Sequence, residues 1–576
     1  MLEDTYDLIV AGAGAAGMAA AIIAHSKNLK VLIVEKTKYV GGTTSYSGAV
    51  AWVPNSRQNR DRGVEDSVAL ATEYLDNVLG NLPGRDARVA YLNHAPEAFE
   101  YIEKVSHLQY FVRDSNSPDY SPQVPGAVLS GRGITPKNFD GRLLGEKFKD
   151  LRPPLPELSL FGRVMVDGVD LYHLLHAKRS LNSAVHVLKM LARDVRDRVF
   201  YSRFGRGTRL TSGNAAVARL YKTVLDMKIP VLLNAPIAGL LKDGGRVSGV
   251  EVQIEGLKRK ILASRGVILA TGGFPWGKDL RKQHMSDVPV GYSAASTDSV
   301  GDGISVAVDA GAKLSTENSD GAFWCPVSVG KRSDGTTAYF PHLMADRSKP
   351  GLIAINGAGK RFYNESENYH DFVRAMLADG DGASDRRYFL ICDASFVRKY
   401  IFGMVPPLAR ARRAQVRSGY LIEARSLEEL ADKTGVSRAG LQETLQRYNH
   451  FAAKGVDPDF GKGSTAYNRY LGDPEHAPNP CLAPIDKAPF YAIQIFPGDI
   501  GTAYGLAADD RSRVLDEQGR PIPGLYACGN DRSSIMGGRY PSGGITIGPA
   551  LTFAYLAVLD VLGLRPVTTT EGRASA

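Results

Sequence analysis

Short apolar runs, each ended by a glycine turn or an acidic residue, mark the predicted strands. Residues 6–11 (Tyr-Asp-Leu-Ile-Val-Ala) form one such run before a glycine turn, and residues 30–34 form a second that ends at Glu35. The alanine-rich stretch 15–25 between them consists of strong helix formers. Continuous apolar runs of this length are typical of strands buried on both faces of a parallel sheet. The order strand, turn, helix, strand and acid predicts a βαβ unit at the start of the chain.

The same pattern returns in the middle of the chain and near its end. The further predicted elements are a strand from 231, a hairpin over 240–254, a strand over 266–270, a strand and turn over 523–530, and a helix over 550–562. Residues 280–487 differ in texture, because they are richer in aromatic residues, proline and mixed charge. We therefore expect an α/β domain built from residues 1–279 and 488–565, with an α+β domain at 280–487 inserted. Residues 566–576 are polar, and we expect them to be disordered.

Composition narrows the class of protein only moderately. The 576 residues are 44% hydrophobic and 23% charged, which is ordinary for a globular protein of two or more domains. The four cysteines are widely spaced and form no CxxC pair, so we expect no disulfide framework and a cytoplasmic location. No secretion signal and no apolar run long enough to span a membrane is apparent. The net charge of +9 comes without a concentrated basic face, so nucleic-acid binding is not indicated.

The first glycine turn has the GxGxxG pattern of a dinucleotide site. Gly12 permits the tight turn, Gly14 lets the backbone approach a pyrophosphate, and Gly17 lets helix and strand pack closely. The pyrophosphate would lie at a helix N-terminus, where free N–H groups favour an anion. Glu35 is placed to accept a hydrogen bond from a ribose 2′-hydroxyl and would repel a 2′-phosphate. The pattern alone is common, but its position between a strand and a helix favours dinucleotide binding.

The loop at residues 41–48, Gly-Gly-Thr-Thr-Ser-Tyr-Ser-Gly, points to one kind of dinucleotide. Glu35-Lys36 followed by Gly41-Gly42-Thr43 resembles flavoproteins of the fumarate reductase and succinate dehydrogenase superfamily. So do the segments 270–273, 301–303 and 529–530, and the resemblance runs from residue 7 to about 557. It implies non-covalently bound FAD in a Rossmann-like domain of the glutathione-reductase type, with a catalytic capping domain. The cofactor-binding residues that we assign are Gly12, Gly14, Ala15, Ala16, Gly17, Glu35, Lys36, Gly42, Thr43, Thr44, Ser47, Gly48, Ile237, Ala270, Thr271, Gly272, Asp302, Gly529, Asn530, Gly544 and Ile545.

Within this superfamily, the catalytic motifs distinguish dicarboxylate reductases from steroid dehydrogenases. A dicarboxylate reductase needs a histidine in the segment 498–505, which has none, and Arg539 is out of register with that family's arginine. Residues 540–550, Tyr-Pro-Ser-Gly-Gly-Ile-Thr-Ile-Gly-Pro-Ala, are similar to a stretch of 3-ketosteroid Δ1-dehydrogenases. The segments 41–54, 360–369 and 119–126 are similar to other parts of that family, although Ala49 replaces a glycine.

This resemblance implies a role for each of four residues. Tyr540 and the backbone N–H of Gly544 would donate hydrogen bonds to the C3 carbonyl of a 3-ketosteroid, which makes the neighbouring C2 proton more acidic. Tyr369 would remove that proton with help from Tyr120, and the hydride at C1 would leave for the flavin, which an external electron acceptor reoxidises. Tyr363 lies six residues before Tyr369, so an error of register would assign the base to the wrong ring.

Other interpretations stay open at this point. Ser542 could replace the backbone donor, which keeps a 3-oxo-5α-steroid 4-dehydrogenase or another enoate-type flavin reductase in view, and a flavin-binding protein without turnover is a third reading. His173 and His176 share a helix face but have no third ligand nearby, so we expect no metal. The segment 388–417 is apolar and then arginine-rich. It is either a core element with a solvated basic face or a peripheral membrane dock.

Overall fold

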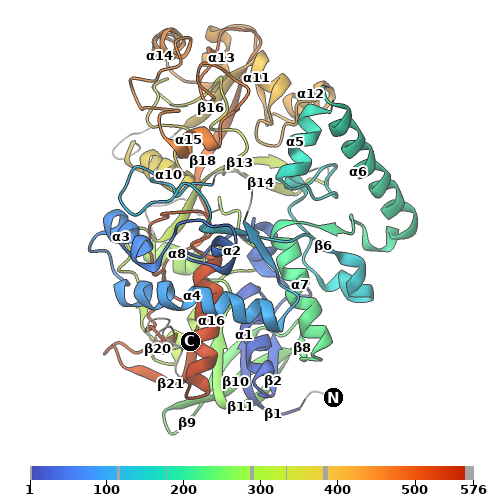
Figure 1. Cartoon of the computed structure of the whole chain (residues 1–576), viewed down its shortest axis with the longest axis vertical. Helices are drawn as coiled ribbons and strands as arrows, with labels where there is room; N and C mark the ends of the chain where they lie inside the picture. The colour runs from blue at the N-terminus through green and yellow to red at the C-terminus, as the bar shows by residue number, and fades with distance from the viewer. Residues whose placement is uncertain are drawn as a thin grey trace.

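The computed structural model describes residues 3–112, 117–177, 179–285, 291–332, 334–379 and 387–564 (Figure 1). The expected disordered tail, 566–576, lies outside the described residues. Within these ranges, two large sheets organise the chain, one at each end of the long axis of the molecule. The first and last described elements, β1 (Thr5–Ala11) and α16 (Ile547–Val561), both lie in the half of the molecule formed by the first sheet.

The first sheet is the predicted parallel sheet, and it contains strands from both ends of the chain. Among the described residues its eight strands are β1 (Thr5–Ala11), β2 (Val31–Val34), β8 (Val231–Leu232), β9 (Ile237–Asp243), β10 (Arg246–Ile254), β11 (Leu257–Leu269), β20 (Arg513–Leu515) and β21 (Pro521–Ala527). The strands β8, β2, β1, β11 and β21 run parallel in that spatial order. The predicted hairpin is β9–β10, and it joins the edge of β11 antiparallel. The expected α/β class with a Rossmann-like core is therefore confirmed.

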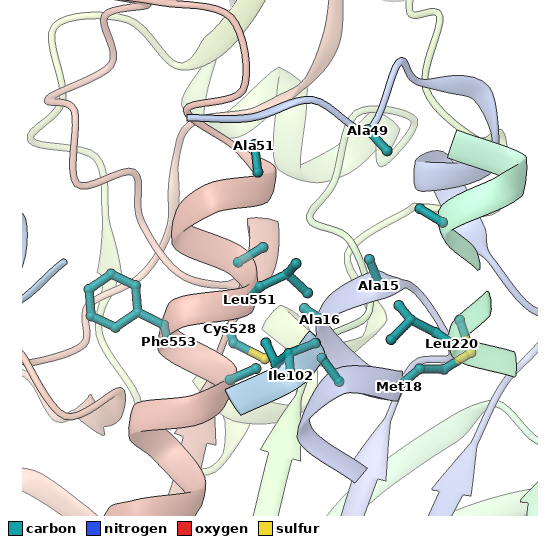
Figure 2. Packing of buried hydrophobic residues seen from close by; sticks show 14 of the residues in the cluster. Ala15, Ala16, Met18, Ala49, Ala51, Ile102, Leu220, Cys528, Leu551 and Phe553 are labelled. Carbon is teal, nitrogen blue, oxygen red and sulfur yellow. The ribbon is translucent and has the colours of Figure 1, made fainter. Parts of the chain in front are cut away.

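Side chains of β1 alternate between two hydrophobic cores, as expected for a strand buried on both faces. Leu8 and Val10 pack with the helices α1 (Ala15–Ser26), α7 (Ser212–Asp226) and α16 (Ile547–Val561). Ile9 and Ala11 pack on the other face with the β9–β10 hairpin. Figure 2 shows the small side chains Ala15 and Ala16 of α1 in the same cluster as Leu220 of α7 and Leu551 of α16. Alanines on α1 let the first helix approach the last one closely.

The second sheet lies in the inserted region and is antiparallel. Among the described residues its six strands are β13 (Ala322–Lys331), β14 (Thr337–Pro341), β15 (Leu352–Asn356), β16 (Tyr388–Asp393), β17 (Ile422–Ala424) and β18 (Phe490–Thr502). The strand β18 pairs with β13, β16 and β17. The expected return to the first domain at residue 488 therefore needs correction, because 490–502 belongs to the second sheet and the chain re-enters the first sheet with β20.

Shorter elements connect and cover the two sheets. The small strands are β3 (Ala51–Trp52), β4 (Tyr110–Val112), β5 (Gly133–Pro136), β6 (Phe139–Asp140), β7 (Arg209–Leu210), β12 (Leu314–Ser315) and β19 (Gly505–Leu506). The remaining α-helices are α2 (Arg57–Arg60), α3 (Val68–Leu79), α4 (Arg85–Val105), α5 (Gly168–His176), α6 (Leu181–Phe200), α8 (Lys278–His284), α9 (Asp302–Asp309), α10 (Tyr369–Asp379), α11 (Ala394–Lys399), α12 (Ala409–Arg417), α13 (Leu427–Thr434), α14 (Arg438–Ala452) and α15 (Ala466–Tyr470). The 3₁₀ helices are η1 (Gly42–Tyr46), η2 (Gly141–Asp150), η3 (Pro156–Leu158), η4 (Ser202–Phe204) and η5 (Gly529–Asp531).

The apolar half of the segment 388–417 is part of the core rather than a surface. All six residues of β16 are buried, as are Phe396 and Val397 of α11, while α12 is exposed and carries the arginines. The alternative of a core element with a solvated basic face is the correct one for this segment. Leu408, between α11 and α12, is the large apolar side chain of the segment that is exposed. Among the described helices, none combines the length and apolarity needed to cross a membrane.

The four cysteines agree with the expectation of no disulfide framework. Cys325, Cys392, Cys481 and Cys528 are all free and buried. Each thiol is held within the hydrophobic interior, where burial raises its pKa.

Candidate active site

A cavity of about 480 Å³ is lined by residues from both the first sheet and the second sheet. Its wall includes Ala11 and Val34 at the carboxyl ends of β1 and β2, and Ala270 directly after β11. Pro341 and Ile500 of the second sheet contribute to the same cavity. A ligand site at the carboxyl ends of parallel strands is the usual arrangement for this kind of sheet.

The glycine turn after β1 has the geometry expected of a cradle for a pyrophosphate. Gly12 has a φ of +107°, and a Cβ there would lie 2.2 Å from the carbonyl oxygen of Ala270. A Cβ on Gly17 would lie 2.0 Å from the carbonyl oxygen of Gly12, so the helix could not approach the strand. Gly14 precedes the first residue of α1, and the place of its Cβ is open space beside the cavity. Close approach of a ligand to this backbone fits the residues present.

Two charged residues after β2 are held in place beside the same cavity. The Glu35 carboxylate accepts hydrogen bonds from the N–H groups of Ala13 and Thr37, each at 3.0 Å. Lys36 forms an ion pair of 2.6 Å with Asp302 at the start of α9. These bonds join β2, the glycine turn and α9. They fix the Glu35 carboxylate at the end of β2, where it could accept from a ribose hydroxyl.

Two glycine substitutions separate cofactor contact from packing. Gly14→Ala is expected to weaken FAD binding at least about tenfold with little change in the stability of the apoprotein, because its Cβ projects into the cavity. Gly17→Ala is expected to destabilise the apoprotein itself by several kcal/mol, roughly as overpacking does, because its Cβ meets a backbone oxygen. Equilibrium titration with FAD and thermal unfolding of the apoprotein measure the two effects. Equal loss of stability in both variants would contradict this assignment.

Most of the predicted cofactor-binding residues line this one cavity. They are Gly12, Gly14, Ala15, Ala16, Glu35, Lys36, Gly42, Thr43, Thr44, Ser47, Gly48, Ile237, Ala270, Thr271, Gly272, Asp302, Gly529, Asn530 and Gly544. Gly17 and Ile545 do not line it. Gly17 acts in the packing of α1, and the Ile545 side chain is buried in the hydrophobic core, so that position can offer only its backbone to a ligand.

The three predicted catalytic tyrosines meet at the part of the cavity next to the second sheet. The Tyr120 hydroxyl donates a hydrogen bond of 3.3 Å to the Tyr369 oxygen. The Tyr540 ring centroid lies 5.1 Å from that of Tyr369 and 6.0 Å from that of Tyr120. All three are buried and line the cavity. Tyr363 is not part of the described cavity wall, and its ring packs against Phe372 instead.

Residues far apart in sequence bring Tyr120 and Tyr540 together. The carbonyl oxygen of Pro541 accepts hydrogen bonds from the Tyr74 hydroxyl at 2.6 Å and from the Tyr120 N–H at 3.2 Å. Asp119, just before Tyr120, accepts from Trp52 Nε1 and from Arg132, each at 2.8 Å. A buried carboxylate with this many donors holds its segment rigidly.

Gly544 is held against the backbone of β3. Its φ is +102°, and a Cβ would lie 2.6 Å from the Trp52 nitrogen, so the position requires glycine. Its carbonyl oxygen accepts from the Trp52 N–H at 3.1 Å. The N–H of Gly544 has no acceptor among the described residues, and the residue lines the cavity. A free N–H beside Tyr540 can act as a second donor to a carbonyl oxygen.

Burial determines how these phenols ionise. Desolvation raises the pKa of Tyr120, Tyr369, Tyr467 and Tyr540 above the ordinary value, so all four are neutral at physiological pH in the free protein. Burial is the main cause of the raised pKa of Tyr369, and the neighbouring phenols Tyr120 and Tyr540 add to the rise. In this arrangement Tyr369 holds a proton, and the Tyr120 hydroxyl forms a hydrogen bond with the Tyr369 oxygen.

The raised pKa of each tyrosine predicts a loss of stability in alkali. In the unfolded chain a phenol ionises near pH 10, while in the folded protein it stays protonated to higher pH. Stability is therefore fully present below about pH 10 and falls as pH rises through the folded pKa, by about 1.4 kcal/mol per pH unit for each such phenol. The free energy of unfolding, measured with urea at a series of pH values above about pH 10, should fall less steeply with pH for Tyr467→Phe than for wild type. Equal slopes would contradict the raised pKa of Tyr467.

Several residues of the cavity wall carried no sequence signal. Tyr467 packs its ring 4.6 Å from that of Tyr120, yet it is one of 26 tyrosines. A further apolar group comes from a connecting segment and from the loop after β14, and it consists of Leu155, Leu158, Met165, Val166, Leu343 and Met344. Such residues could have been found only from their proximity in space.

Comparison with known proteins agrees with this geometry. The family described as FAD binding domain matches residues 7–547. The chain belongs to this family. It is an FAD-binding enzyme, a dehydrogenase of the fumarate reductase flavoprotein superfamily, as the sequence resemblance implied.

Three relatives are similar over nearly their whole length. A 4-oxocyclohex-2-ene-1-carboxylate 5-dehydrogenase of Sinomonas cyclohexanicum is 39% identical, with 97% of this chain and 94% of the relative covered. A 3-oxosteroid 1-dehydrogenase of Mycolicibacterium smegmatis is 36% identical, with 97% and 98% covered. The crystal structure of the 3-ketosteroid Δ1-dehydrogenase of Sterolibacterium denitrificans in complex with 1,4-androstadiene-3,17-dione has a TM-score of 0.89 at 37% identity, with 97% of this chain and 100% of that chain covered.

Proposed function

We propose that this chain is an FAD-dependent 3-ketosteroid dehydrogenase that introduces the 1,2 double bond. The observation that carries the proposal is the convergence of Tyr369, Tyr540 and the N–H of Gly544 on the same cavity as the glycine turn. The similarity to 3-oxosteroid 1-dehydrogenases over nearly the whole chain supports it.

Each of the polar groups has a step that it can perform. Tyr540 and the Gly544 N–H donate to the C3 carbonyl oxygen and stabilise negative charge there, which makes the C2 proton acidic. Tyr369 first loses its own phenolic proton to solvent, and its phenolate oxygen, within hydrogen-bonding distance of the Tyr120 hydroxyl, then receives the C2 proton. When bound, FAD supplies the acceptor for the hydride that leaves C1, and an external electron acceptor regenerates it.

We also propose that FAD is bound without a covalent link. Histidine and cysteine are the side chains that most often form the covalent link to a flavin. No histidine or cysteine lines the cavity within the described part of the chain. Acid precipitation should therefore release the whole flavin into the supernatant, whereas flavin retained in the pellet would contradict the proposal.

The apolar end of the cavity favours a steroid over a small charged ketone. The cations in the wall are already paired, Lys36 with Asp302 and Arg152 with Asp298 at 2.7 Å. A substrate carboxylate would be costly to bury without a free cation nearby. Leucine and methionine side chains at this end would instead pack against fused apolar rings.

The second candidate substrate is 4-oxocyclohex-2-ene-1-carboxylate. The 39% identity to the Sinomonas dehydrogenase is the observation that favours it. Anaerobic mixing of the holoenzyme with each compound discriminates the two, because reduction bleaches the flavin absorbance. We expect fast bleaching by a 4-en-3-one steroid and little or none by the carboxylate. Bleaching by the carboxylate alone would reject the steroid and favour the second candidate.

A 4-dehydrogenase is less supported, because Ser542 has another partner. Burial raises the pKa of Asp119, and the Ser542 hydroxyl is among the hydrogen-bond donors that offset this effect. We expect Ser542→Ala to keep turnover within about threefold of wild type, since a hydroxyl held at Asp119 is not the carbonyl donor. Steady-state kinetics and product analysis check this. A loss of about 100-fold would assign the donor role to Ser542.

A further inference from the structure

Helix α6 presents its apolar side to solvent. Its outward residues, called here the outer face of α6, are Leu181, Val185, Leu188, Leu191, Val195 and Val199. Leu181 is 82% exposed, and Leu188 and Val199 are 66% and 65% exposed. At 100° per residue these six positions occupy one arc of about 120°, so they form a continuous stripe. Figure 1 shows α6 along the outer edge of the molecule.

The opposite side of α6 is polar and faces the protein. Asp194 is buried and pairs with Arg163 at 3.1 Å and with Arg198 at 2.8 Å. Asp197 is also buried and accepts from the Thr208 N–H at 2.7 Å. Because its inner acids are bonded, α6 cannot roll its apolar stripe inward without leaving these carboxylates unpaired.

Basic residues border the outer face on both sides. Lys189, Arg193 and Arg196 follow one border of the stripe, and Arg198 follows the other. Lys189 and Arg198 are exposed, and the two acids of this helix are both turned inward. An apolar stripe with Lys and Arg at its borders is typical of a helix that lies in the interface of an anionic bilayer.

We propose that the outer face of α6 docks on an anionic lipid surface. The helix would lie in the plane of the headgroups, with its leucines and valines among the acyl chains and its basic borders at the phosphates. A second copy of this chain fits less well. Arg196 and Arg198 are paired with Asp197 and Asp194, but symmetric pairing would still bring the like charges of Lys189 and Arg193 on the two helices toward each other.

The docking helix is joined to the candidate active site. Helix α5 packs against α6, with a hydrogen bond of 3.0 Å between His173 Nδ1 and Ser183 Oγ and one of 2.8 Å between His186 Nε2 and the Asp170 carboxylate. Met165, just before α5, lines the cavity. The chain therefore runs from the cavity wall at Met165 directly into α5, which packs against α6. A steroid partitions into lipid, so the arrangement would bring its source close to the site, and this step rests on the proposed function.

Co-sedimentation with lipid vesicles tests the surface directly. The holoenzyme is mixed with vesicles of phosphatidylcholine alone or with added phosphatidylglycerol, and the bound fraction is measured. We expect binding to the anionic vesicles, at least about tenfold weaker for Leu188→Glu/Val195→Glu, and weakened by salt. Leu257→Glu is the matched control, since Leu257 is 75% exposed on β11 of the first sheet, and it should bind as wild type. Flavin content and turnover without vesicles should be unchanged in all variants.

A second variant keeps the test decisive if the double variant does not fold. Lys189→Glu/Arg193→Glu reverses the border charge without changing the stripe, and it should lose binding to anionic vesicles. Absence of vesicle binding by wild type, or equal binding by wild type and both α6 variants, would overturn the proposal. A wild-type dimer in sedimentation equilibrium that Leu188→Glu/Val195→Glu converts to monomer would also overturn it, because the face would then join two copies. Vesicle binding needs no turnover, so failure of the proposed reaction would be seen separately.

Discussion

Tyr369→Phe is expected to slow flavin reduction by a 4-en-3-one steroid by about 10²–10⁴-fold, because the phenolic oxygen that receives the C2 proton is removed. The ring remains, and the hydroxyl that is lost accepts the hydrogen bond of Tyr120. The fold and FAD binding should therefore change little. Anaerobic stopped-flow measurement of flavin bleaching gives the rate, and steroid-induced changes in the flavin spectrum before bleaching give the affinity.

Tyr363→Phe is the matched control for this experiment. It lies on the same segment six residues earlier, and its ring packs against Phe372 outside the described cavity wall. We expect this variant to reduce its flavin at a rate within a few-fold of wild type. If Tyr363→Phe were inactive and Tyr369→Phe active, the base would have to be reassigned.

Tyr540→Phe is expected to lower the rate of flavin reduction by about 10²–10³-fold, or roughly 3–4 kcal/mol, because one of two carbonyl donors is lost. The effect should fall on kcat more than on KM, since the negative charge on the oxygen develops only as the C2 proton leaves. The residual rate reflects the Gly544 N–H. A loss confined to KM would show that Tyr540 binds the substrate without stabilising the developing charge.

Tyr467→Phe serves as the control for Tyr540. Both side chains are buried in the same cavity wall, and the rings of Tyr467 and Tyr540 both lie within 6.0 Å of that of Tyr120. The Tyr467 oxygen has no hydrogen-bond partner within the described residues. Removing it should therefore leave flavin reduction within a few-fold of wild type. A loss as large as that of Tyr540→Phe would add Tyr467 to the groups that handle the proton.

The contrast between these tyrosines shows what a sequence motif can and cannot supply. Tyr540 and Gly544 are four residues apart in a recognisable stretch, so their pairing was predictable. Tyr120 and Tyr369 lie 249 positions apart, and only the folded chain brings their hydroxyls within hydrogen-bonding distance. Tyr467 reaches the same cluster from α15 with no motif around it.

Domain boundaries show the same limit. The pattern of apolar runs located β1, α1, β2, the β9–β10 hairpin, β21 and α16 to within a few residues, except that β11 begins well before its predicted start. It placed the return to the first domain at residue 488, whereas β18 belongs to the second sheet. A buried strand has the same apolar pattern in either sheet. Only the strands with which it forms hydrogen bonds show to which sheet it belongs.

The sequence by itself determined the glycine turn, the acid after β2 and the family, because these depend on residue types at short fixed spacings. Gly17 is required by a backbone contact within one βαβ unit, and Gly12 by its φ of +107°, while Gly14 leaves open space beside the cavity, and local chemistry can predict all three. The cluster of phenols and the outward direction of the α6 stripe were decided only by the tertiary structure. A periodic pattern specifies that a helix has an apolar side, but the ion pair of Asp194 with Arg163 and the hydrogen bond from Thr208 to Asp197 decide which side faces solvent.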